Sequence, residues 1–340
     1  MNDTGSSNRG PARARGAGAR VCRRGACPWP SVHALSTPSM PRTWLGPLLA
    51  FVALCVVWGY SWVLLKIGLL DAGPFSYAGL RTLLGACALL ALLPLLRRPV
   101  RVGRWRELVV LGLVNTTGLV GCSQWALVEG AANRTSILVY TMPFWTLILG
   151  WRLLGERLRG LQWPAVAAAA LGLCCVLNPA TFAGSPRSTL LALGAAWFWA
   201  LGVIVVKRIQ SRGPIDLLAL TAWQMFFGGL VLCAFALGAD EPAVHWTPRF
   251  LTVLGVTALV STGAGWALWV YLLHRLPAGT ASLMTLMVPV IAVISSSWQL
   301  GEYLAASDLA GIVAIVLGLA LLAVHALLQH RSVTGTAAPE

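Results

Sequence analysis

Apolar residues of this 340-residue chain come in long blocks instead of alternating with polar residues. Ten blocks of 18–23 residues can be delimited, at about 46–68, 76–96, 108–128, 132–153, 161–178, 188–207, 217–237, 249–271, 278–299 and 307–328. A helix rises about 1.5 Å per residue, and about twenty residues cross the roughly 30 Å of bilayer hydrocarbon. The pattern predicts an all-α polytopic membrane protein with ten transmembrane helices.

The distribution of charged residues predicts how the spans are oriented in the membrane. The chain carries 25 Lys and Arg against 11 Asp and Glu, and a net charge of +14 would suit nucleic-acid binding if it formed a soluble patch. With the N-terminus in the cytoplasm, however, twenty basic residues fall in cytoplasmic segments, four fall outside, and Arg81 lies within a span. The positive-inside rule describes this asymmetry. We therefore expect a lipid bilayer around the chain, no nucleic-acid partner, and both termini in the cytoplasm.

The two ends of the chain differ from the apolar part. Residues 1–43 are rich in Gly, Ala, Arg, Ser and Pro and contain no apolar core of a secretory signal peptide. A disordered basic cytoplasmic tail, an organellar transit peptide, and an extension ahead of a start at Met40 are all compatible with this composition. Residues 330–340 are predicted to form a cytoplasmic C-terminal tail.

The chain also repeats itself. Shifted by 146 residues, PFWTLILGWRLLGE, from Pro143 to Glu156, falls on PVIAVISSSWQLGE, from Pro289 to Glu302. Nearer the N-terminus, a shift of 141 aligns a tryptophan with a tryptophan and a lysine with a lysine. Apolar composition alone does not align proline, glycine and glutamate. The repeat therefore indicates two copies of one structural unit.

The predicted units are residues 44–180 and 187–329, each with five spans. Because five is odd, the second unit enters the membrane from the opposite side, and a pseudo-two-fold axis in the membrane plane relates the two. Many secondary transporters have this architecture, with a solute site near the midplane between the halves. We expect matched helices of both units to line one pathway.

Several motifs of the repeat resemble those of a known family. They are the Trp58-Gly59 pair, Pro74-Phe75 followed by Arg81, and the doubled frame from proline to Gly-Glu. Over about residues 44–328 the sequence is similar to the drug/metabolite transporter superfamily, of the kind built from two EamA domains. This resemblance implies ten helices, cytoplasmic termini, and carriage of a small solute across the inner membrane.

Arg81 is the most unusual residue of the spans. A helix that starts near Pro74 would place it roughly 10 Å below the outer surface, where a charge costs up to about 3 kcal/mol on insertion scales. One interpretation is structural, an arginine that snorkels or caps a helix. The other is a guanidinium that faces a wet cavity and meets an anionic or carboxylate-bearing solute.

Other pathway candidates share a position inside a span and either an aromatic ring, a polar group or a proline. Buried glutamines need a partner, from another helix or from the solute. Each proline removes a backbone donor and would kink its helix, leaving a carbonyl that a cavity can satisfy. The candidates are Trp58, Tyr60, Ser61, Arg81, Gln124, Pro143, Trp145, Trp199, Gln224 and Pro289.

Glu156 and Glu302 would stand at span ends. They are either structural carboxylates that hold a hairpin or gates at the two faces of the pathway. The last span of each unit carries two small residues four apart, Ala168 with Gly172 and its repeat, which let helices approach closely within the bundle or between two chains of a homodimer.

The absence of certain side chains from the spans narrows the range of possible functions. No Asp or Glu lies near the middle of a span, whereas the small multidrug-resistance branch of the superfamily couples drug cations to protons through a carboxylate in its first helix. Histidines lie in tails, loops or span ends, and Cys22 and Cys27 have no neighbouring ligand residues, so we expect no enzyme, metal or cofactor. The leading hypothesis is a carrier that exports a small polar metabolite, such as an amino acid. The alternatives are a multidrug or other small-solute efflux carrier of the same fold, and a membrane scaffold or receptor.

Overall fold

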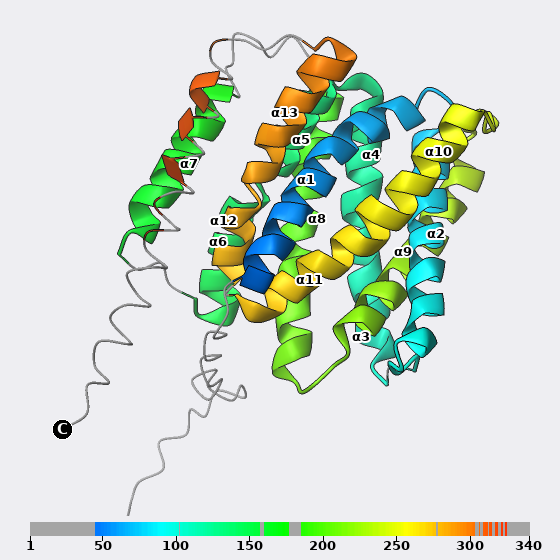
Figure 1. The fold of residues 1–340 in the computed structure, drawn as a ribbon, viewed down its shortest axis with the longest axis horizontal. Coiled ribbons are helices and arrows are strands. Elements are labelled where there is room, and N and C mark those ends of the chain that lie inside the picture. Colours follow the sequence, from blue (N-terminus) through cyan, green and yellow to red (C-terminus); the bar gives the residue numbers. More distant parts are fainter. Residues whose placement is uncertain are drawn as a thin grey trace, which may run out of the picture. The chain divides into compact units, whose positions relative to one another are not determined.

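A computed structural model describes residues 45–101, 103–156, 160–176, 185–276, 278–302 and scattered positions between 306 and 324. The two tails and most of the tenth predicted span lie outside these residues. Within them, every regular element is a helix (Figure 1), and eight helical segments are long and apolar enough to cross a membrane. The all-α membrane class is therefore confirmed. The count of ten stays a prediction, because α7 (Gln162–Val176) has only 15 residues.

The helices follow the same order in both units. The first unit contains α1 (Leu45–Gly68), α2 (Pro74–Leu95), α3 (Trp105–Leu111), η2 (Gly112–Gly118), α4 (Leu119–Glu129), α5 (Ala132–Val139), α6 (Met142–Leu154) and α7 (Gln162–Val176). The second contains α8 (Pro186–Ser211), α9 (Leu217–Gly238), α10 (Pro248–Val256), η4 (Thr257–Ala264), α11 (Gly265–Arg275), α12 (Ala278–Met284) and α13 (Met287–Leu300).

The third span of each unit is interrupted by a π-helical stretch. These stretches are η2, between α3 and α4, and η4, between α10 and α11. A π-helix breaks the regular i to i−4 hydrogen bonding and occurs frequently at functional sites. The amino-acid sequence did not predict these two π-helical stretches.

The fourth span of each unit is two helices, α5 with α6 and α12 with α13. Pro143 and Pro289 were expected to kink a continuous helix and to leave a carbonyl free. They instead lie in the first turn of α6 and of α13, respectively, because the preceding helix has already ended. A proline in a first turn removes no intrahelical hydrogen bond, so it favours the start of a new helix there.

The Gly-Glu pair that follows is explained by the way these helices end. Gly155 and Gly301 have φ values of 71° and 66°, in the left-handed region that glycine adopts without a steric cost. The next N–H groups, of Glu156 and Glu302, donate back to the carbonyls of Gly150 and Ser296. This is the usual glycine C-cap of a helix, and it turns each glutamate away from its own helix.

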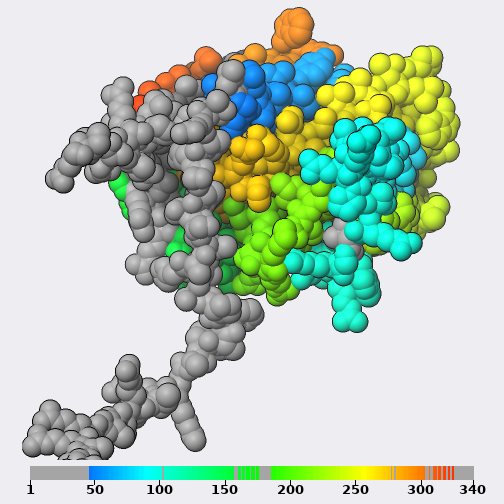
Figure 2. Space-filling model, turned by 60° about the horizontal axis from the view of Figure 1, so that its bottom comes forward, coloured from blue at the N-terminus to red at the C-terminus, as the bar shows by residue number. Residues whose placement is uncertain are grey.

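The two units are packed against each other along matched helices. α2 and α9 run side by side, so closely that a Cβ atom at Gly79 would lie 2.6 Å from Cys233 Sγ. α1 packs against α13, and α8, its counterpart, packs against α6. Figure 2 shows the molecule turned so that the end with the α2–α3 and α8–α9 connections comes forward. The interface between the units therefore forms the core of the bundle.

Candidate functional site

An aromatic cluster occupies the centre of the interface between the units. Its members are Trp58, Tyr140, Trp199, Trp266 and Trp269, each at most 7% exposed. The rings of Trp58 and Trp199, which the repeat aligns, lie 5.5 Å apart, and Trp199 lies 5.1 Å from Tyr140. Most contacts are edge-to-face, the arrangement that aromatic quadrupoles favour. The rings pack directly on one another across the interface between the units.

One side of the cluster is attached to η4. The indole N–H of Trp58 donates to the Ser261 carbonyl at 3.0 Å. The next residue, Thr262, accepts a hydrogen bond through Oγ1 from Arg81 Nη1 at 2.9 Å. One turn earlier on α2, the Tyr77 hydroxyl lies 3.0 Å from Thr257 Oγ1. Consecutive η4 residues therefore bind Trp58 of α1 and Arg81 of α2.

The equivalent crossing at η2 has different chemistry. Gln224 of α9 occupies the position that Arg81 has on α2, and its Oε1 accepts from Asn115 Nδ2 at 3.2 Å. Asn115 is the η2 counterpart of Ser261. The indole N–H of Trp199 is buried and has no partner in the described part of the chain, nor do Asn115 Oδ1 and Gln224 Nε2. The side chains at this crossing carry no charge, and several of their hydrogen-bonding groups have no partner in the described residues.

Glu302 joins the two units at one end of the bundle. Its two carboxylate oxygens accept the backbone N–H groups of Ala132 and Asn133, at 2.8 and 2.9 Å, at the start of α5. Lys66 Nζ donates to the carbonyls of Leu127 and Gly130 at the end of α4, at 2.6 and 2.8 Å, and interacts electrostatically with Glu302. We refer to the set formed by Glu302, Lys66 and the turn between α4 and α5 as the Glu302 clasp.

The opposite end of the bundle, where α6 lies beside α12 (Figure 1), carries the same arrangement with the units exchanged. Glu156, at the end of α6, accepts the Ala278 N–H at 3.2 Å at the start of α12. Lys207 Nζ donates to the Leu273 and Leu276 carbonyls at the end of α11, at 2.6 Å each, and interacts with Glu156. We call this set the Glu156 clasp. Carboxylates at helix starts and ammonium groups at helix ends are stabilised by the partial charges of the helix termini.

Each glutamate thus binds the start of a helix of the other unit. The sequence placed both glutamates at span ends but gave no role to the lysines. The signal that could have identified them is their alignment at 141 residues, because no other lysine occurs in the chain.

The remaining pathway candidates lie outside the aromatic cluster. Tyr60 is 37% exposed and donates to Gln299 Oε1 at 2.8 Å. Ser61 is bonded to the Trp58 carbonyl of its own helix. Gln124 is fully buried, with a long contact of 3.4 Å from Nε2 to the Leu65 carbonyl. Trp145 packs on Trp197 in a separate pair, 5.3 Å between ring centres.

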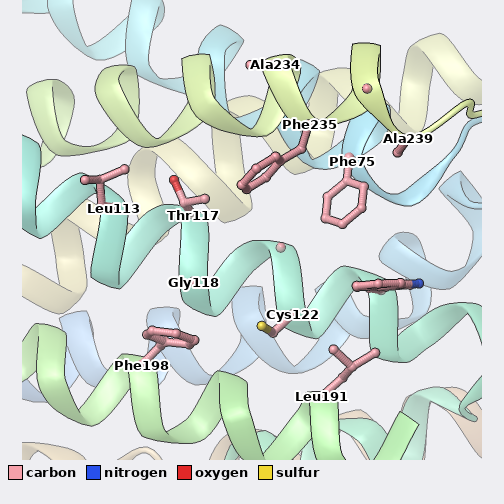
Figure 3. A pocket seen from close by; sticks show the side chains of 13 residues that line it. Phe75, Leu113, Thr117, Gly118, Cys122, Leu191, Phe198, Ala234, Phe235 and Ala239 are labelled. Carbon is pink, nitrogen blue, oxygen red and sulfur yellow. The ribbon is translucent and has the colours of Figure 1, made fainter. Parts of the chain in front are cut away.

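A lateral pocket of about 580 Å³ lies away from all these residues. Figure 3 shows it between α2, η2 with α4, α8 and α9; Phe75, Phe198 and Phe235 point into it. Its rim includes the exposed side chains of Leu113 and Phe235, and no charged residue lines it. The described residues contain no group of three His, Cys, Asp or Glu side chains that could hold a metal ion.

Comparison with known proteins agrees with the repeat. A profile described as the EamA-like transporter family matches residues 44–178 and again 187–324. The chain is 31% identical over 283 residues to the Salmonella typhimurium "Probable amino-acid metabolite efflux pump" (79% of this chain, 92% of that one). It is 30% identical over 300 residues to the Bacillus subtilis "Uncharacterized transporter YvbV" (87% and 97%). A solved structure described as "Crystal structure of protein" is similar in fold, with a TM-score of 0.68 at 17% identity over 84% of this chain and 98% of that one.

Proposed function

The chain belongs to the EamA-like transporter family, and from this premise we propose that it is an inner-membrane carrier that exports a small polar metabolite by alternating access. An amino acid or a related compound is the proposed substrate. The name of the Salmonella relative supports this substrate class and the outward direction. The distribution of Lys and Arg supports cytoplasmic termini, which place the Glu302 clasp at the outer face.

The observation that carries this proposal is the pair of clasps. Each clasp joins the two units at one end of the bundle, and each is made of a carboxylate, two helix ends and a lysine. Hydrogen bonds to charged groups contribute about 1.5–3 kcal/mol each, which is comparable with the free-energy gap of a few kcal/mol between carrier states. Release of one clasp while the other persists would open one face only. Two clasps related by the repeat therefore suit a carrier whose halves rock.

The first experiment compares the metabolites in the medium of cells that overexpress the chain with those of vector-control cells. Compounds that accumulate outside are then tested by counterflow in liposomes that contain purified protein, with protein-free liposomes as the control. We expect at least one amino-acid-class compound to accumulate and to exchange in the liposomes. Purified protein that passes an inorganic ion but no organic metabolite would refute the proposal.

A further inference from the structure

Arg81 is a buried cation with few partners. Arg81 is 6% exposed, and its side chain forms no ion pair within the described residues. A guanidinium has five N–H donors. One of these N–H groups, on Nη1, donates to Thr262 Oγ1, and Nε has no partner in the described structure. Since a buried charge costs several kcal/mol unless it is paired, such an arginine needs an anion.

The protein does not supply that anion from the helices packed around α2. Those helices are α9, η4, α4 and α10, together with the α1–α2 connection. Of their acids and those at their ends, Glu129, Asp216 and Asp71 are paired with arginines. Asp240, just after the end of α9, is exposed and forms no ion pair within the described residues. Glu241 accepts the N–H groups of Phe75 and Ser76 at the start of α2. None of these carboxylates forms an ion pair with Arg81 in the described structure.

Packing does not require a charge at this position. At the equivalent crossing, Gln224 of α9 meets Asn115 of η2, and a neutral amide fills the place of the guanidinium. Both crossings bring a glycine against a backbone carbonyl, Gly85 against Ala258 and Gly228 against Gly112. The backbone frame is thus the same with and without the cation, which indicates that the charge serves the solute.

We propose that Arg81 binds the carboxylate of the transported metabolite, beside Thr262 of η4 and next to the aromatic cluster. This inference rests on the proposed function and specifies which chemical group the substrate needs. Arg81 and Trp58 are held by consecutive residues, so a carboxylate on the guanidinium places the rest of the solute near the aromatic rings. The planar fork of arginine suits bidentate recognition of a carboxylate.

The amine of an amino acid has no equivalent partner. Among the described residues, no Asp or Glu lies near the aromatic cluster, because these acids stand at or near helix ends or in the connections between helices. Recognition should therefore depend strongly on the carboxylate and weakly on the ammonium group. The site predicts that acids with a blocked amine are carried, whereas amides with a free amine are not.

Counterflow in liposomes can test this with three matched sets, built on alanine, leucine and phenylalanine. Each set contains the free amino acid, its α-amide and its N-acetyl derivative. In at least one set, wild-type protein should exchange the free acid and the N-acetyl acid, and should exchange the amide at least about tenfold more slowly, as loss of one charge-assisted contact implies. Arg81→Gln should lose at least about tenfold for both acids and should no longer distinguish acid from amide.

Arg81→Gln copies the residue found at the equivalent crossing, and size-exclusion profile and thermal unfolding show whether it folds. Should it not fold, the wild-type series and Arg81→Lys, which keeps the charge, still decide the question. Equal exchange of acid and amide by the wild type, or an undiminished preference for acids in Arg81→Gln, would overturn the inference and leave the proposed function standing. Absence of exchange of these compounds and of every metabolite found in the medium would overturn both.

Discussion

The two units share their frame and differ in the chemistry at one pair of helix crossings. Both have a proline at the start of the second half of the fourth span, a left-handed glycine at its end, and a glutamate that binds the other unit. Where α2 meets η4, however, the polar residue is Arg81, and where α9 meets η2 it is Gln224. Under our proposal, the shared features serve the fold and its motion, whereas the differing residues serve solute binding.

The connections at the two ends show the same division. Arg104 and Arg249 both precede or begin a third span, 145 residues apart. Arg104 donates to the carbonyls of Ile209 and Arg212, whereas Arg249 binds the Asp71 carboxylate through two nitrogens. A common arginine thus ties each third span to a connection of the other unit, with a different acceptor in each case.

The largest effect is expected where the shared frame is tightest. A Cβ atom at Gly85 would lie 2.7 Å from the Ala258 carbonyl oxygen, and one at Gly228 would lie 2.6 Å from that of Gly112. Gly85→Ala and Gly228→Ala must therefore push helices apart, at a cost of up to about 3 kcal/mol each. We expect both variants to lose most of the yield of monodisperse protein and to unfold at lower temperature.

Gly194→Ala is the matched control for this pair. Gly194 lies in α8, where an added methyl group would meet no atom of the described residues within 4 Å. Alanine there should leave stability unchanged or raise it by about 0.5–1 kcal/mol. A large loss for Gly85→Ala with none for Gly228→Ala would show that the two crossings are not equivalent, and would break the comparison between the units.

The clasps provide the second test. Glu302→Gln and Glu156→Gln each weaken charge-assisted hydrogen bonds worth about 1.5–3 kcal/mol, enough to raise the open fraction of one face roughly tenfold or more. Ser136 of α5 and Ser282 of α12 are fully buried and 146 residues apart, so they are matched reporter positions. In a chain without its native cysteines, each serine would be replaced by cysteine and its reaction with a membrane-impermeant thiol reagent measured.

We expect Glu302→Gln to accelerate labelling at position 136 and Glu156→Gln to accelerate it at position 282. Each variant should leave the other reporter unchanged or slower, because opening of one face closes the other in alternating access. If either variant accelerates both reporters equally, it has loosened the bundle, and the clasps are structural and not gates.

Many features that the two units share could be predicted from the sequence, and the same physical reasons explain which features could not. Block length and the repeat predict the helices and the matched units, because these depend on local sequence. Pro143 and Pro289 predicted kinks, whereas the structure starts a new helix at each of them. The sequence also aligned Trp58 with Trp199, which the structure brings into contact. It could not tell that Tyr60 is partly exposed, because a span that is apolar on every side has no polar face to mark its orientation.

The clasps were beyond the sequence for another reason. Glu302 meets the start of α5 across 169 and 170 residues, a juxtaposition that depends on how the units interlock. Only the alignment of the two glutamates, at 146 residues, and of the two lysines, at 141, indicated that these residues act as sets. Inverted repeats make such hints usable, since a contact found in one unit predicts its counterpart in the other.

The smallest expected effect concerns Gln224. Gln224→Leu removes one neutral hydrogen bond, to Asn115, and should lower stability by about 0.5–1.5 kcal/mol with transport of the free acid changed less than about threefold. Counterflow and thermal unfolding, measured beside Arg81→Gln, give the comparison directly. A loss of transport as large as that of Arg81→Gln would mean that the solute uses both crossings, and the division between a charged solute-binding unit and a neutral one would be wrong.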